Sequence, residues 1–63
     1  MSLQPQLSSV STVLQELTAR ISELADAAAE ERREAVATGL YEVERSLRTA
    51  QRRLAKVAGD ARE

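Results

Sequence analysis

The chain contains no cysteine, histidine, tryptophan or phenylalanine, and it has one proline, two glycines and one tyrosine. Without cysteine it has no disulfide, no thiolate metal site and no thiol nucleophile. Without histidine it lacks the commonest metal ligand and general base. We therefore expect a protein that is not an enzyme and that binds neither a cofactor nor a metal.

With 63 residues, the chain is short. A domain of this size buries only about 60% of its unfolded surface, so its stability is marginal without disulfides, metal or oligomerisation. Oligomerisation is the source of stability that the composition leaves. No apolar run approaches the roughly 18 residues of a membrane span, and the first residues lack the basic and apolar segments of a secretory signal. We expect a cytoplasmic protein with no membrane partner.

Apolar residues recur along both halves of the chain at alternating intervals of four and three, the heptad pattern of a helix that packs against another helix. In the first half this row consists of Leu3, Leu7, Val10, Leu14, Leu17, Ile21, Leu24 and Ala28. In the second half it consists of Val36, Leu40, Val43, Leu47, Ala50, Leu54, Val57 and Ala61. The pattern predicts an all-α protein and argues against strands.

The two rows are mirror images about Arg32, which predicts eight antiparallel layers between them. A hairpin that folds back near Arg32 satisfies this symmetry, and so does one long helix paired antiparallel with a second copy. The rows are out of phase by one residue across residues 29–35, which favours the hairpin. We predict one helical module over 1–63, with a helix over about 3–29, a turn over about 30–34 and a helix over about 35–60.

Several local features leave alternatives open. The expected turn has strong helix formers and no Gly, Pro, Asn or Asp, so the long antiparallel helix stays an alternative. A bend at Thr38 and Gly39 is another, although Gly39 opposite Ala25 is more simply explained by close approach of the helices. Ser2 and Gln4 are candidates to cap the first turn.

Small or apolar side chains flank the heptad rows, namely Ser11, Val13, Thr18, Ala25, Ala27, Ser46 and Ala58. Two-stranded coiled coils usually carry charged residues there, and small flanks allow further helices to approach. We therefore predict that two hairpins associate into a four-helix bundle, a homodimer, through a core of Leu14, Leu17, Ile21, Leu24, Leu40, Val43, Leu47 and Leu54.

The charge of the chain is unevenly distributed, with an acidic first half and a basic second half. The second half carries the candidate partner-binding residues Tyr41, Arg45, Arg48, Arg52, Arg53 and Lys56. The carboxylates Glu30, Glu31 and Glu34 are expected to lie in solvent at the apex of the hairpin, because no histidine accompanies them to complete a metal site. The sequence favours a structural or protein-interaction (adaptor) module, with a small regulator that binds nucleic acid or a transcription protein through the basic residues as the alternative.

Overall fold

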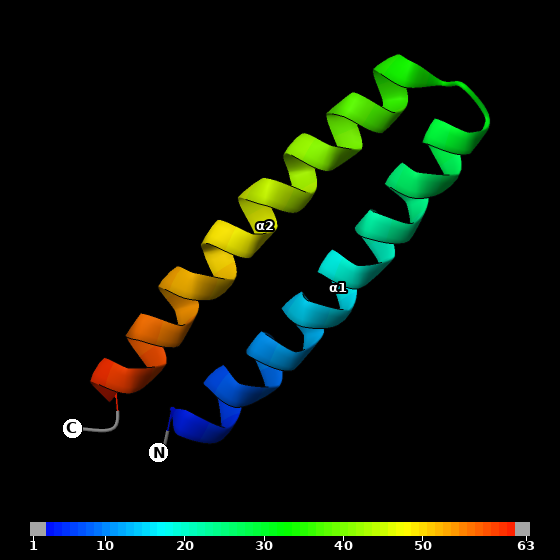
Figure 1. Cartoon of the computed structure of the whole chain (residues 1–63). Helices are drawn as coiled ribbons and strands as arrows, with labels where there is room; N and C mark the ends of the chain where they lie inside the picture. Colours follow the sequence, from blue (N-terminus) through cyan, green and yellow to red (C-terminus); the bar gives the residue numbers. More distant parts are fainter. Residues whose placement is uncertain (1–2, 62–63) are drawn as a thin grey trace.

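A computed structural model of the chain describes residues 3–61, and these residues form two helices. Helix α1 spans Gln4–Glu30 and helix α2 spans Glu34–Ala61. The helices lie side by side and antiparallel, joined by one tight turn (Figure 1), in a particle of 48 × 15 × 11 Å. The predicted all-α helical hairpin is confirmed, and the described residues contain no strand. The turn between Glu30 and Glu34 excludes one continuous helix. Gly39 lies inside α2, so the chain does not bend there.

The first turn of α1 is not capped by a side chain. Leu3 occupies the N-cap position, Pro5 lies in the first turn where its missing N–H costs nothing, and the backbone N–H of Leu7 donates to the Leu3 carbonyl. The prediction that Gln4 caps this turn is wrong, because its side-chain amide reaches across the hairpin and donates to the Ala58 carbonyl. Ser2, the other predicted cap, lies outside the described residues.

The turn is built by backbone hydrogen bonds around Arg32, although its residues favour helix. The N–H of Arg33 donates to the Ala28 carbonyl at 2.9 Å, and the N–H of Arg32 donates to the Ala29 carbonyl at 3.1 Å. This is the Schellman arrangement that ends many helices, and it requires a left-handed residue, usually glycine. Here Arg32 takes that conformation, with φ 61°. Arg33 then accepts the first backbone bond of α2, from the N–H of Ala37.

We expect Arg32→Gly to raise the free energy of unfolding by about 0.5 to 1 kcal/mol. The left-handed conformation costs a residue with a Cβ about 1 to 2 kcal/mol, and the greater entropy that glycine loses on folding offsets only part of this. Arg32→Ala is the matched control, because it removes the same charge and retains the Cβ. Urea unfolding followed by circular dichroism measures both, and equal stability of the two variants would contradict the role of backbone strain.

The helices contact each other through small side chains on one side of the heptad rows. The buried residues are Thr18, Ala25 and Ala28 of α1 and Ala37 of α2. Half-buried apolar side chains adjoin them at Leu7, Leu14, Ile21, Leu40, Leu47 and Leu54. The predicted layers are therefore wrong for the exposed residues, which are four of the eight in the first row and five of the eight in the second. Because small residues such as Ala25 allow the backbones to approach closely, the helices turn toward them and away from the larger side chains.

Candidate interaction surface

In the heptad rows, the N-cap residue Leu3, three residues of α1 and four of α2 face away from the opposite helix. The large ones are strongly exposed: Leu3 55%, Val10 54%, Leu17 49%, Leu24 56%, Val36 41%, Val43 45% and Val57 51%. Ala50 is exposed at the same spacing. Residues seven apart lie nearly in line along a helix, so each set of four forms one ridge.

The two ridges lie on the same broad side of the hairpin. Six of the eight ridge residues precede a half-buried residue by four positions, as Leu3 precedes Leu7 and Val36 precedes Leu40. Equivalent positions of two antiparallel helices face the same side. Leu24 and Val36 accordingly border one hollow near the turn. We call the apolar face the surface formed by Leu3, Leu7, Val10, Leu14, Leu17, Ile21, Leu24, Val36, Leu40, Val43, Leu47, Ala50, Leu54 and Val57.

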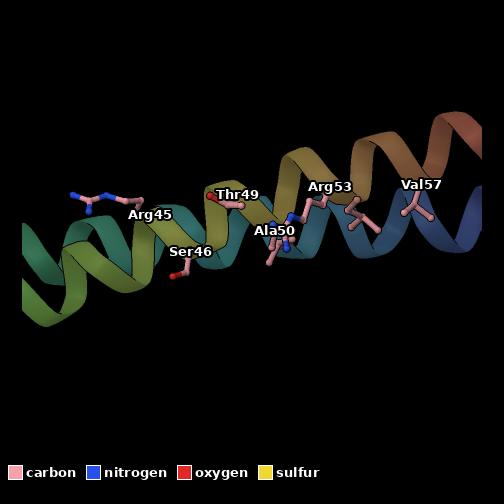
Figure 2. Close-up of a pocket in the computed structure, with 8 residues that line it drawn as sticks. Arg45, Ser46, Thr49, Ala50, Arg53 and Val57 are labelled. Atoms are coloured by element: carbon pink, nitrogen blue, oxygen red, sulfur yellow. The ribbon is translucent and has the colours of Figure 1, made fainter.

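An open groove of about 690 Å³ runs along the α2 side of the apolar face (Figure 2). Its apolar lining comes from Leu14 of α1 and from Ala50, Leu54 and Val57 of α2, while Arg45 and Arg53 border it. Apolar floors edged by charged side chains are typical of surfaces that bind another protein.

The hairpin has no core of large side chains among its described residues. None of these large side chains is fully buried, and the buried apolar residues are three alanines. The chain exposes 5030 Å² of surface, whereas a compact monomer of its mass exposes about 4,000 Å². The excess is close to the roughly 800 Å² that each partner buries in a typical stable protein complex.

The opposite side of the hairpin, which we call the polar face, is closed by hydrogen bonds. The buried Thr18 hydroxyl donates to the Leu14 carbonyl at 2.7 Å and accepts from the Gln51 side-chain amide. Near the turn, the Tyr41 hydroxyl donates to Asp26 at 2.8 Å. No buried side-chain polar atom of the described residues lacks a partner. The polar face therefore needs no further partner to satisfy its buried groups.

Tyr41 belongs to this hydrogen-bonded face. The hydrogen bond to Asp26, followed by desolvation and the negative charges of Asp26 and Glu44, raises the pKa of Tyr41 above its ordinary value of 10. Each of these effects favours the neutral phenol, which is the form that donates the hydrogen bond to Asp26. Tyr41 is thus a structural link between α1 and α2 as well as a candidate contact residue.

The predicted core residues and the predicted partner-binding residues occupy different places. Leu14, Ile21, Leu40, Leu47 and Leu54 are half-buried along the contact between the helices, whereas Leu17, Leu24 and Val43 are on the exposed ridges. The cations lie around the outer side of α2. Arg48 and Arg52 border a hollow of the polar face, Arg53 borders the apolar groove, Arg45 borders hollows on both faces, and Lys56 is exposed.

Sequence reasoning misplaced several small residues. Ser11, Thr18 and Ala25 were expected to admit a neighbouring hairpin, but they line the contact between the two helices of the same chain. Val13 and Ala27 remain exposed beside the apolar face. The Thr18–Gln51 pair was missed, since a threonine beside a heptad row is an ordinary surface residue until its register with the other helix is known.

Residues 3–61 contain no group of three or more carboxylates placed to hold a metal ion, and this includes Glu30, Glu31 and Glu34. Neither α1 nor α2 is long and apolar enough to cross a membrane. Comparison of the chain with protein-family models, curated proteins and solved structures finds no match. Functional inference therefore depends on the surface of the hairpin itself.

Proposed function

We propose that this chain is a non-enzymatic protein-interaction module that works as a homodimer. Two hairpins pack their apolar faces together in a four-helix bundle, and the polar faces are presented to another protein. The observation that carries the proposal is the pair of exposed ridges on one face, from Leu3 to Leu24 and from Val36 to Val57. Exposed apolar surface of this extent marks an interaction site in a monomer.

A second copy is the partner that best fits this face. The face is long and built from two ridges, so an identical face can meet it along its whole length. The groove beside Leu54 and Val57 also gives the partner's ridge a place to insert. A C2 dimer uses the same patch twice, which makes a self-complementary surface the simplest way to cover it.

Burial in the dimer supplies the core that the single hairpin lacks. Fully burying a leucine or valine contributes about 1.5 to 3 kcal/mol relative to an exposed side chain. The seven large ridge residues of each copy are between two-fifths and three-fifths exposed in the hairpin. Their burial stabilises the assembly enough to offset the loss of translational and rotational freedom on association.

Sedimentation equilibrium combined with small-angle scattering tests the proposal on the unmodified chain. We expect a mass twice the 6.9 kDa of one chain and a longest dimension near the 48 Å of one hairpin. Helix content and mass should fall together on dilution, because the hairpin depends on its partner. A fully helical monomer at high micromolar concentration would contradict the proposal.

A further inference from the structure

Three shallow hollows follow one another along the polar face, away from the proposed dimer interface. The hollow nearest the turn is bordered by Tyr41 and Arg48, the next lies between Arg48 and Ala55, and the last reaches Gly59. Their volumes are about 490, 360 and 310 Å³. Neighbouring hollows share Arg48 or Ala55, so they form one continuous depression, which we call the polar furrow. From Tyr41 to Gly59 it runs for about 27 Å along α2.

The end of the polar furrow away from the turn is lined mainly by small side chains. Two serines of α1 and two alanines of α2 border it together with Gly59. A Cβ built on Gly59 would have no heavy atom within 4 Å, so the furrow is open there. The same holds for Gly39, and its predicted close approach to Ala25 is therefore wrong. Because small side chains let another backbone approach closely, this end can accept a third helix.

The polar furrow is basic, although the whole chain has a net charge of -1. Its three hollows are bordered by Arg45, Arg48 and Arg52 and by a single carboxylate, that of Glu44. All three arginines belong to α2 at intervals of three and four residues, so they follow one stripe of that helix. The α1 side of the furrow contributes uncharged side chains such as Gln15.

Most of this positive charge is not neutralised within the hairpin. The only salt bridge in residues 3–61 joins Arg48 to Glu44, at 2.8 Å, and the Arg48 side chain remains 59% exposed. Arg52 donates a hydrogen bond to the Thr49 hydroxyl at 3.3 Å and, like Arg45, pairs with no carboxylate in this part of the chain. The guanidinium groups are therefore free to bind carboxylates of another molecule.

Tyr41 gives the furrow a fixed aromatic end. Its hydroxyl donates to Asp26 at 2.8 Å, which holds the ring beside Arg45 and Arg48. Tyrosine and arginine are the residue types that contribute most binding energy at protein interfaces. The furrow therefore combines an aromatic anchor, a row of cations and a stretch of small side chains.

We propose that the polar furrow binds an acidic helix of another protein. A helix of about 18 residues spans its length. Carboxylates at intervals of three and four on such a helix would each meet one arginine, and small residues beyond them would pack at the Gly59 end. This inference rests on the part of the proposed function in which the polar face is presented to a protein partner. The furrow and the apolar face lie on opposite sides, so both can be occupied together.

Titration of the unmodified chain with a helical peptide tests the proposal. The probe is a blocked peptide of about 18 residues with glutamates at intervals of three and four among alanines and glutamines. We expect a dissociation constant below about 1 mM, with changes in amide NMR resonances concentrated at Arg48, Gln51 and Ala55. The peptide with glutamine in place of every glutamate should not bind. Absence of binding by the glutamate peptide, or changes spread evenly over both faces, would overturn the inference.

Arg48→Gln with Arg52→Gln should weaken peptide binding about tenfold, since each exposed charge pair contributes a few-fold. Neither arginine borders the apolar groove, so the dimer should persist. The matched control is Arg20→Gln with Lys56→Gln, which removes two positive charges at exposed positions outside the furrow. Its dissociation constant should stay within about twofold of wild type at physiological salt, where distant charges are screened. Equal weakening by the two double variants would show a response to net charge alone and would overturn the inference.

Two further measurements separate this partner from the alternatives. A DNA duplex that binds more tightly than the glutamate peptide, and that depends on the same two arginines, would overturn the inference in favour of nucleic acid. Sedimentation equilibrium of the free chain gives the mass. A dimer that does not bind the peptide would overturn this inference alone, and a monomer that binds it would overturn the homodimer alone. A mass of four chains or more would overturn the inference if a further copy covers the furrow and excludes the peptide.

Discussion

Replacing Leu17 with aspartate should convert the dimer into a largely unfolded monomer. Leu17 is 49% exposed in the hairpin and lies in the middle of the α1 ridge. In the proposed bundle an aspartate there is buried without a partner, which costs about 3 to 5 kcal/mol. The twofold axis places two such charges in each dimer. We expect the dissociation constant to rise more than a hundredfold, and most of the helical signal to disappear because the hairpin has no large core.

Ala19→Asp is the matched control for this experiment. Ala19 is exposed on α1 and lies in line with Asp26 on the polar face, away from the apolar face, so the same charge is added to the same helix without burial. Its expected cost is the lower helix propensity of aspartate, below about 0.7 kcal/mol. Sedimentation and circular dichroism at matched concentrations compare the two variants. Retention of both mass and helix content by Leu17→Asp would show that the apolar face is not the interface.

Ala25→Leu should destabilise the hairpin by about 1 to 3 kcal/mol. Ala25 is fully buried between α1 and α2, close to the turn. A leucine there must push the helices apart or adopt a strained rotamer, and overpacking in a tight contact has a cost of this size. The wider separation would also weaken the Tyr41–Asp26 hydrogen bond, which lies one residue further along α1.

The comparison variant is Ala19→Leu, which adds the same side chain at an exposed position of the same helix. It should leave stability within about 0.5 kcal/mol of wild type, as surface substitutions usually do. Urea unfolding at a fixed chain concentration measures both variants, since stability of a dimer depends on concentration. If Ala25→Leu is as stable as Ala19→Leu, the close contact between the helices at Ala25 is incorrect.

The turn illustrates how local propensity and tertiary contacts compete. Residues 29–35 favour helix, which kept a continuous helix among the predictions. The hairpin forms because closing the turn lets the alanines and leucines of α2 pack against α1. This packing outweighs the left-handed strain of Arg32. The phase break between the two heptad rows was the sequence signal that favoured the turn correctly.

The division of the heptad rows illustrates what periodicity does not determine. Spacings of four and three place Leu14 and Leu17 on one apolar stripe. The spacing does not determine whether the line of Leu14 or the line of Leu17 contacts the other helix. The helices contact each other on the Leu14 side, because the alanines and Thr18 beside Leu14 are small and let the two backbones approach. The Leu17 row is left on the surface, and this exposed row is the basis of the proposed interaction site.

The sequence by itself determined that this protein is helical, that its apolar residues form two heptad rows of equal length, and that its charge is unevenly distributed between the two halves. Heptad spacing, mirror symmetry and the absence of cysteine and histidine are local properties that can be read along the chain. Only the tertiary structure decided which side of each row is buried, that Thr18 binds Gln51, and that an exposed apolar face results. These features depend on the rotation and height of one helix relative to the other, which are set by the summed packing of many small side chains.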